Sequence, residues 1–293
     1  MWFGARTATS FGCPPAASVS ARSSRAEGVR VSPAELEALR ELAVRLGERA
    51  AAIHREGLER GFEVHQKSSA TDYVTEIDRA AEAAIVEGIL AERPDDGILG
   101  EEGTDRAGTS GVRWVIDPLD GTANYVRGYP AYCAVVGVEV DGVPSVGVVV
   151  DSHGTRSEGV RGSGATRNGS SIRPSSRDDL ASAVISTGFG YQPEQRARQA
   201  RVASIVLPMV ADIRRSGSAA FDLVAAACGI VDAYYEVGLA PWDVCAGRVI
   251  VESAGGVVRT IPQPVGGVLT VAAPTQLLEP LLTLLSEAGL TTG

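Results

Sequence analysis

The chain has 293 residues, of which 44% are hydrophobic and 22% are charged. This composition is typical of a globular protein that buries a large core in one or two domains, and it excludes disordered and fibrous classes. Acidic residues (36) outnumber basic ones (27), which gives a formal net charge of −9. We expect no direct nucleic-acid binding, because such binding depends on neutralising phosphates with lysine and arginine.

The first 30 residues differ from the rest. They are rich in Ser, Ala, Arg, Gly and Pro, show no hydrophobic period, and hold four arginines against one glutamate. We predict a flexible N-terminal tail over 1–30, since a transit peptide would add an amphipathic face and a secretory signal an apolar core. The best candidate for a membrane helix, 131–150, is broken by Glu139 and Asp141, so we predict no membrane association and a cytoplasmic protein.

The cysteines are widely separated and include no CxxC pair. The histidines also lack the spacing of zinc ligands. We therefore predict reduced cysteines in place of a disulfide framework or a zinc site. The residues concerned are Cys13, Cys133, Cys228 and Cys245, with His54, His65 and His153.

The pattern of order begins at Ser32. Ser32 can cap a helix, Pro33 fits the first helical position, and Glu35 complements the exposed amides of the first turn. Apolar residues then recur at helical spacing, which predicts a helix as far as Gly57 or Gly61.

Helices and short β-rich runs follow. Asp141-Gly142 has the composition of a two-residue hairpin turn, which predicts an antiparallel sheet segment around it. The whole pattern predicts either a layered α/β fold with a mixed sheet or an α+β fold. The predicted strands cover 114–116, 135–140, 145–150, 183–186 and 233–236, with two more after 254, and the further helices cover 78–94, 193–210, 218–230, 241–254 and 274–288.

The segment WVIDPLDGT at 114–122 is the most informative. Its apolar strand carries Asp117 to the strand end, and the turn at Pro118 returns Asp120 beside it. Gly121 leaves the backbone open to a ligand, and amides at the start of a following helix would bind an anion. Paired carboxylates beside free amides suit a cation and a phosphate together, although the same residues also fill ordinary strand-to-helix turns.

Two further carboxylates stand in comparable positions. Glu101 follows a short apolar run, and Asp243 lies in the first turn of a predicted helix, where it also fits as a complement to the helix dipole. If both meet the aspartates of the 114–122 segment, mutual repulsion would open the site unless a cation neutralised them. All-oxygen ligands select a hard ion, so we expect Mg²⁺.

Three motifs occur in order: Gly100-Glu101-Glu102, then WVIDPLDGTAN at 114–124, then Trp242-Asp243 followed by Ala254-Gly255-Gly256. With weaker segments at 67–78, 162–169 and 215–220, the chain resembles the inositol monophosphatase family of Mg²⁺-dependent, lithium-sensitive phosphatases. The resemblance covers the chain from about residue 30 to the C-terminus. It implies an α+β fold of the sugar-phosphatase type, a layered αβαβα sandwich with mixed, largely antiparallel sheets. The phosphatase domain would span 31–293, with an N-terminal half at about 31–175 and a C-terminal half at about 176–293.

The resemblance also implies roles for individual residues. The attacking water would be positioned and activated by Glu101, Asp78 and Thr122, although Asp78 also fits as an N-terminal helix carboxylate. Two or three Mg²⁺ ions would be held by Glu101, Asp117, the backbone carbonyl of Leu119, Asp120 and Asp243. The substrate would contact Asp120, Gly121, Thr122, Ser218, Ala219, Glu236 and Asp243.

The chemistry is consistent on physical grounds. A phosphate monoester is doubly anionic near neutral pH, so a carboxylate-rich pocket repels it unless cations reverse the sign. Two ions about 3.5 to 4 Å apart can lower the pKa of bound water, orient it and stabilise the leaving alkoxide. No covalent intermediate is needed, which fits the lack of a recognisable Ser-His-Asp or Cys-His constellation in the sequence.

We predict that the protein hydrolyses a small phosphate monoester, and we rank myo-inositol 1-phosphate as the first candidate substrate. We also predict a homodimer. The segment 214–220 and Glu236 resemble inositol-type members, while histidinol phosphate, a fructose bisphosphate and a 3′-phosphoadenosine nucleotide are the alternative substrates. A regulatory protein of a transcription or RNA-processing complex is the alternative of another class, because some bacterial family members that resemble this chain are linked to such complexes. A dinucleotide enzyme is disfavoured, since Arg167 replaces the third glycine after Gly162-x-Gly164.

Overall fold

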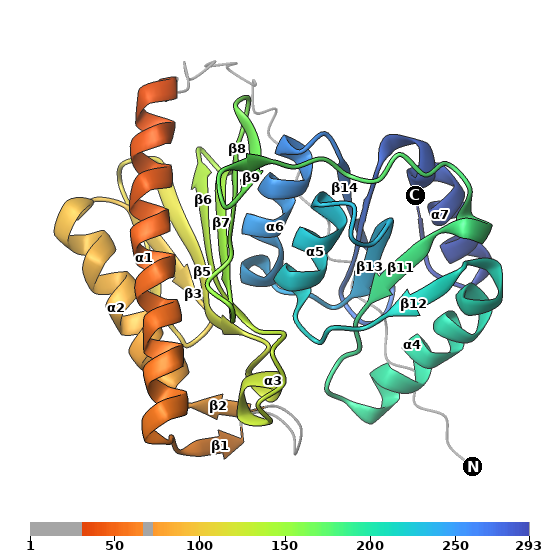
Figure 1. The fold of residues 1–293 in the computed structure, drawn as a ribbon, viewed down its shortest axis with the longest axis horizontal. Helices are drawn as coiled ribbons and strands as arrows, with labels where there is room; N and C mark the ends of the chain where they lie inside the picture. The colour runs from red at the N-terminus through yellow and green to blue at the C-terminus, as the bar shows by residue number, and fades with distance from the viewer. Residues whose placement is uncertain (1–30, 67–72, 293) are drawn as a thin grey trace, which may run out of the picture.

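The computed structural model describes residues 31–66 and 73–292, so the predicted tail over 1–30 lies outside the described residues. Helices and sheets alternate in five layers, seen edge-on in Figure 1. Their order is α1 with α2, an eight-stranded sheet, α5 with α6, a five-stranded sheet, and α4 with α7. This αβαβα arrangement confirms the predicted fold class. The division into halves near residue 175 stays a proposal.

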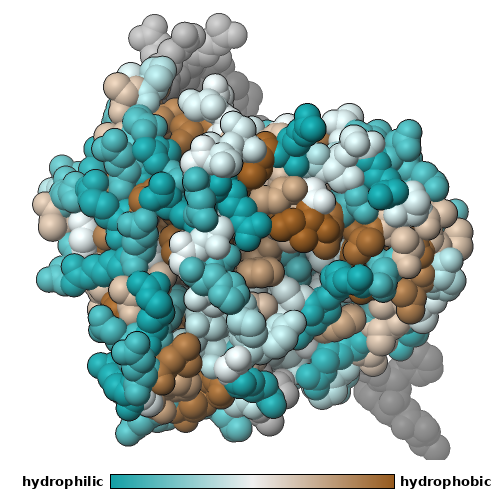
Figure 2. All heavy atoms as spheres, viewed as in Figure 1, coloured by the Kyte–Doolittle hydropathy of each residue, from teal (hydrophilic) through white to brown (hydrophobic). Residues whose placement is uncertain are grey.

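The first layer is held by two capped helices. In α1 (Pro33–Arg60) the Ser32 hydroxyl accepts a hydrogen bond from the Glu35 amide, as the sequence predicted. The second helix, α2 (Glu76–Glu92), begins at a capping box between Thr75 and Asp78, two residues before the predicted start. Both helices bury an apolar face against the larger sheet, and hydrophilic side chains cover the outer side of α1 in Figure 2.

The larger sheet follows the order β10-β9-β8-β7-β6-β5-β3-β4. Every neighbouring pair is antiparallel except β3 with β5. The predicted hairpin at Asp141-Gly142 joins β6 to β7, with φ of 50° and 75° at the two turn residues. The strands are β3 (Gly97–Gly100), β4 (Asp105–Arg106), β5 (Val112–Asp120), β6 (Cys133–Val140), β7 (Val143–Asp151), β8 (Arg156–Val160), β9 (Gly164–Arg167) and β10 (Ser170–Ser171).

The smaller sheet follows the order β12-β11-β13-β15-β14. Strand β11 runs parallel to both of its neighbours, β12 and β13, and the other two pairs are antiparallel. The strands are β11 (Val184–Thr187), β12 (Asp212–Arg214), β13 (Ala233–Val237), β14 (Val257–Pro262) and β15 (Val268–Ala273), and the helices are α3 (Thr122–Val126), α4 (Pro193–Val206), α5 (Ala219–Ala227), α6 (Pro241–Ser253) and α7 (Thr275–Glu287).

Three glycines bring the middle helix layer close to the larger sheet. Gly137, Gly147 and Gly159 lie side by side on β6, β7 and β8. A Cβ atom on Gly147 would approach the carbonyl oxygen of Ala246 in α6 to 2.2 Å, so no side chain fits there. The close approach sets α6 directly on the sheet and carries the start of α6 toward the end of β5 (Figure 1).

The structure corrects several predicted boundaries. The helix predicted over 193–210 ends at Val206, because Pro208 has no N–H for the next helical bond, and a 3-10 turn follows. The helix predicted over 218–230 ends at Ala227, and Gly229 turns the chain with φ of 67°. The strands β3, β4, β8, β9, β10 and β12, and the pair β1 (Val64–Gln66) and β2 (Tyr73–Thr75), were not predicted because they are short or polar.

The structure also bears on the predictions about disulfide bonds and membrane helices. Cys133, Cys228 and Cys245 are free thiols, while Cys13 lies outside the described residues. No helix in the described part of the chain is long and apolar enough to cross a membrane.

Candidate active site

The site forms where β5 ends beside β3. Pairing of β5 with β6 shifts register between Asp117, opposite Val135, and Asp120, opposite Cys133. The strand therefore continues past its predicted end, and Pro118 and Leu119 leave the regular ladder. The Asp117 carboxylate accepts the Leu119 amide at 3.0 Å. Because β3 is parallel to β5, their carboxyl ends lie at one edge, and the Glu101 amide donates to the Ile116 carbonyl at 3.2 Å.

Two helix N-termini close the site from the other side. Asp120 accepts hydrogen bonds of 2.7 Å from the Ser218 hydroxyl and from the Ala220 amide, at the start of α5. Asp243, in the first turn of α6, accepts the Ala240 amide at 2.7 Å. The middle helix layer therefore faces the end of β5 with two positive helix termini, which stabilise carboxylates there.

A cavity of about 380 Å³ opens between these elements. All predicted site residues line it except Asp78. The lining includes Glu101, Asp117, Leu119, Asp120, Gly121, Thr122, Ser218, Ala219, Glu236 and Asp243. The structure thus brings together side chains that are more than 140 positions apart in the sequence.

The carboxyl groups of the cavity repel one another. Burial, followed by the charges of Glu101, Asp120 and Asp243, raises the pKa of Asp117 well above its ordinary value, and Asp117 also shares a hydrogen bond with Glu101. Burial and Asp120 likewise raise the pKa of Asp243. Burial raises the pKa of Asp120 to about 6, against the opposing effect of its donors from Ser218 and α5. Carboxyl groups are therefore concentrated here, and Arg215 is the one basic side chain in the described lining of the cavity.

The donor set fits a hard divalent cation. Carboxylate and carbonyl oxygens line the cavity, with no sulfur or imidazole ligand among them, and this chemistry suits Mg²⁺. A cation would remove the repulsion that raises the three aspartate pKa values. In the described residues no three His, Cys, Asp or Glu side chains are already grouped around one point as ligands, since Asp120 and Asp243 are turned to the amides of α5 and α6.

Asp78 lies behind the cavity wall. It is fully buried, and its carboxylate accepts the amide and hydroxyl of Thr75 at 2.8 and 2.6 Å. Its second oxygen accepts the Thr122 hydroxyl at 2.9 Å. The helix-capping role and the contact with a predicted site residue coexist, and Asp78 reaches the cavity only through Thr122.

Two supporting residues were not predicted. Glu82, one turn beyond Asp78 on the buried face of α2, accepts the amides of Glu102 and Thr104 and so holds the loop that carries Glu101. The signal in the sequence was a carboxylate at helical spacing among apolar residues. No comparable pattern in the sequence indicated a role for His54.

His54 supports the backbone of the 114–122 segment. Its Nε2 lies 2.9 Å from the Pro118 carbonyl, next to the register shift in β5. Burial lowers the pKa of His54 to about 4, so the ring is neutral near pH 7 and Nε2 donates. The Tyr125 hydroxyl in turn donates to the His54 carbonyl at 2.7 Å. A carbonyl that leaves the strand ladder is thereby satisfied from α1.

Comparison with known proteins now identifies the family. Residues 35–288 match the Inositol monophosphatase family. The chain belongs to that family. It is 40% identical over 236 residues to the Mycobacterium tuberculosis (strain ATCC 25618 / H37Rv) protein named Inositol-1-monophosphatase SuhB, covering 76% of this chain and 81% of the relative. It is 44% identical over 196 residues to the Xylella fastidiosa protein named Nus factor SuhB, covering 66% of this chain and 70% of that relative.

Solved structures agree with this membership of the inositol monophosphatase family. The Mycobacterium tuberculosis SuhB structure matches with a TM-score of 0.75 and 35% identity, over 86% of this chain and 96% of that one. The Thermotoga maritima IMPase matches with a TM-score of 0.76 and 28% identity, over 86% and 98%. The five-layer arrangement is therefore shared with experimentally solved members.

Proposed function

We propose that the chain hydrolyses small phosphate monoesters with Mg²⁺, and that myo-inositol 1-phosphate is its preferred substrate. The observation that carries the proposal is the convergence of Asp117, Asp120 and Asp243 in one cavity, with pKa values raised by burial and mutual repulsion. Such a cavity favours a cation, and a cation makes it attractive to a phosphate dianion. The relative in Mycobacterium tuberculosis, named for inositol-1-monophosphatase, supports the choice of substrate.

The carboxylates of Glu101, Asp117, Asp120 and Asp243, with the Leu119 carbonyl, would hold the Mg²⁺ ions. When bound, Mg²⁺ supplies positive charge for the phosphate and lowers the pKa of water. The chain's own residues then orient the reactants, as follows.

Thr122 orients the attacking water. Its one hydroxyl proton lies between the Asp78 carboxylate at 2.9 Å and the Leu119 carbonyl at 3.0 Å, which leaves its lone pairs to accept from a water molecule. Glu101 lines the same cavity and can take the proton that the water loses. Asp78 acts on the water through the Thr122 hydroxyl.

The phosphate group and the alcohol portion of the substrate would contact different walls of the cavity. Gly121 has φ of 88° and precedes α3, so the first amides of that short helix can bind phosphate oxygens. On the opposite wall Glu236 accepts the Tyr234 hydroxyl at 2.7 Å, and burial raises the pKa of Glu236 to about 7. Glu236, Asp243, Ser218 and Ala219 would contact the hydroxyl groups of a polyol.

A substrate panel tests the proposal. Purified protein is assayed for phosphate release from inositol 1-phosphate, histidinol phosphate, fructose 1,6-bisphosphate and 3′-phosphoadenosine 5′-phosphate, with Mg²⁺ and with EDTA. We expect the largest kcat/KM for inositol 1-phosphate and no turnover in EDTA. A rate that survives chelation would contradict the metal-dependent proposal, and a larger kcat/KM for another ester would reassign the substrate alone.

A second candidate function rests on the relatives named Nus factor SuhB in Xylella fastidiosa and Pasteurella multocida, 44% and 41% identical to this chain. In that case the chain would act as a regulatory member of a transcription complex. The Asp117→Asn variant separates the candidates. Loss of phosphatase activity with full retention of a cellular role would assign that role to binding.

Three further properties belong to the same proposal. A homodimer, inhibition by lithium and a cytoplasmic location follow from the family resemblance. Analytical ultracentrifugation, a lithium titration of the Mg²⁺-dependent rate, and cell fractionation test them separately.

A further inference from the structure

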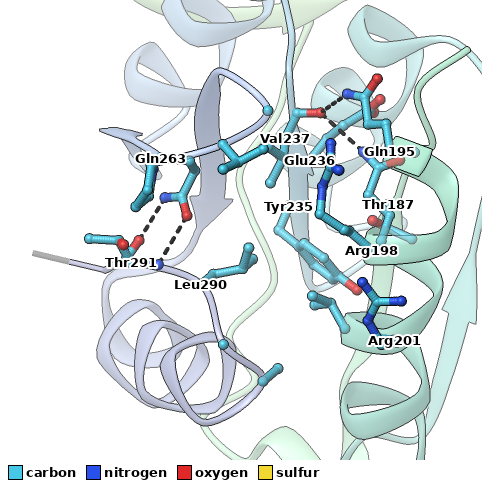
Figure 3. Close-up of a pocket in the computed structure, with 18 residues that line it drawn as sticks. Thr187, Gln195, Arg198, Arg201, Tyr235, Glu236, Val237, Gln263, Leu290 and Thr291 are labelled. Atoms are coloured by element: carbon cyan, nitrogen blue, oxygen red, sulfur yellow. Dashed lines mark hydrogen bonds between the residues drawn. The ribbon is translucent and has the colours of Figure 1, made fainter. Parts of the chain in front are cut away.

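A second cavity of about 400 Å³ lies on the other face of the smaller sheet, between α4, α7 and the loop from β14 to β15 (Figure 3). It shares Gly188, Gln195, Glu236 and Val237 with the candidate active site. Both cavities therefore open at the carboxyl ends of the parallel strands β11 and β13.

The strand order explains why a crevice forms there. From β11 the chain leaves through α4 to β12 on one side, whereas from β13 it leaves through α6 toward β14 on the other. Connections that diverge from adjacent parallel strands leave a crevice at their carboxyl ends, and such crevices bind ligands in α/β proteins. Here the crevice is continued on both faces of the sheet, and the second face has no role in the proposed phosphatase reaction.

Two arginines give this second cavity a positive wall. Arg198 and Arg201, three residues apart on α4, are exposed and lie on the Tyr235 side of the cavity in Figure 3. Among the described residues neither guanidinium has an ion-pair or hydrogen-bond partner. The only carboxylate in the described lining is Glu236, so the lining carries net positive charge.

A buried hydroxyl without a hydrogen-bond partner among the described residues also indicates that this cavity binds a ligand. The Tyr235 side chain is 4% exposed, faces Thr187, and its hydroxyl makes no hydrogen bond of ordinary geometry in the described part of the structure. Buried hydroxyls usually have a partner. The lining also has apolar side chains, among them Val202 on α4 itself, Val265 and Leu290.

We propose that this cavity binds a small amphipathic organic anion, with its anionic group on Arg198 and Arg201 and its apolar body against Val202, Val265 and Leu290. The volume suits a molecule of small-ligand size. Guanidinium groups bind carboxylate, sulfonate or phosphate oxygens through paired N–H donors. This binding does not depend on the phosphatase reaction.

Two fluorescent probes of matched skeleton test the proposal. 8-Anilinonaphthalene-1-sulfonate carries the anionic group, and N-phenyl-1-naphthylamine lacks it. Each is titrated into the full chain in EDTA, where the carboxylates of the neighbouring cavity repel anions. We expect saturable binding of the sulfonate, and about tenfold weaker binding of the neutral probe, which corresponds to one charge-assisted contact.

Variants locate the site. The double change Arg198→Ala/Arg201→Ala should weaken sulfonate binding about tenfold, whereas Arg196→Ala, which removes one positive charge from the same helix outside this cavity, should leave it unchanged. Val265→Glu, at a position 63% exposed, should weaken it as well by placing a carboxylate at the rim. Thermal unfolding confirms that each variant is folded.

The proposal is overturned by any of three results: the sulfonate does not bind the wild-type chain, the neutral probe binds equally well, or Arg196→Ala weakens binding as much as the double variant. The last result would place the probe elsewhere on the basic face of α4.

Discussion

Two groups of buried carboxylates in this protein are stabilised in opposite ways. Asp96, 1% exposed, accepts the Trp114 indole at 2.8 Å, the Arg93 guanidinium at 2.9 Å and the Ser110 hydroxyl at 2.7 Å. Glu158 is similarly enclosed by Arg40 and Arg156. In the cavity Asp117 and Asp120 are buried and Asp243 is partly buried, but the charges that raise the pKa of Asp117 and of Asp243 come from other carboxylates.

The difference separates carboxylates that stabilise the fold from carboxylates that are available for chemistry in the cavity. Asp96 and Glu158 each have an arginine from the chain itself, so their burial is balanced within the fold. The cavity group leaves its charge to be balanced by something bound. Substitutions should therefore affect activity at one group and stability at the other.

The largest effect is expected for Asp117→Asn. Asparagine can still accept the Leu119 amide, but it removes one of the charges that we propose bind Mg²⁺. The Mg²⁺-dependent kcat should fall about a thousandfold, equivalent to about 4 kcal/mol. In EDTA the free energy of unfolding should rise by about 1 kcal/mol, because a repelling charge is removed. Steady-state kinetics and urea unfolding check the two parts, and a marked loss of stability would show that Asp117 is structural.

Asp96→Ala should give the reverse result. It leaves the Trp114 indole and the Arg93 guanidinium without their buried acceptor. The free energy of unfolding should fall by about 3 kcal/mol, while KM for Mg²⁺ stays within a factor of two of the unaltered protein. Urea unfolding and a Mg²⁺ titration measure these quantities. A selective loss of Mg²⁺ affinity would refute the distinction between the groups.

The pH dependence of stability gives a third, smaller effect. Burial raises the pKa of Asp222, in the cavity lining, to about 7, and that of Asp120 to about 6. A carboxyl with a raised folded-state pKa binds its proton more tightly when folded. Stability in EDTA should thus fall as pH rises from about 4 to 7, and Mg²⁺ should restore part of it.

Asp222→Asn is the matched control for the pH effect. The amide oxygen can still accept from the Ser216 backbone, which donates to Asp222 at 3.4 Å. Urea unfolding at pH 5 and pH 7.5 in EDTA should show a shallower decline for this variant. An identical decline in both proteins would assign the pH dependence to other groups.

The sequence predicted those parts of the fold that carry a strong local signal. The cap at Ser32, the hairpin at Asp141-Gly142 and the long amphipathic helices all have residue types whose local energetics favour one conformation. Short polar strands such as β8 and β12 form only because a neighbouring strand offers its hydrogen bonds, so their own residues show no period. The end of α4 at Val206 was missed although Pro208 signals it.

For the site, motifs carried most of the information. The family resemblance predicted the site residues that line the cavity, because acidic residues at strand ends and helix starts form motifs that can be recognised in the sequence. Distances are not recognisable in this way: Asp78 was named with the others, yet it is fully buried behind Thr122. His54 and Glu82 were missed since most of their partners are backbone groups, which every residue possesses.

Glu82 lies between the two groups of carboxylates, and Glu82→Gln gives the smallest effect. Its oxygens accept the amides of Glu102 and Thr104 at 2.8 and 3.1 Å and the Thr104 hydroxyl at 2.6 Å. Glutamine keeps one acceptor oxygen and turns an NH₂ group toward a donor, so the loop that carries Glu101 should loosen. The half-saturating Mg²⁺ concentration should rise about tenfold, with less than about 1 kcal/mol lost from stability. Glu87→Gln, at an exposed position of the same helix, should change neither quantity, and equal behaviour of the two variants would show that Glu82 does not position Glu101.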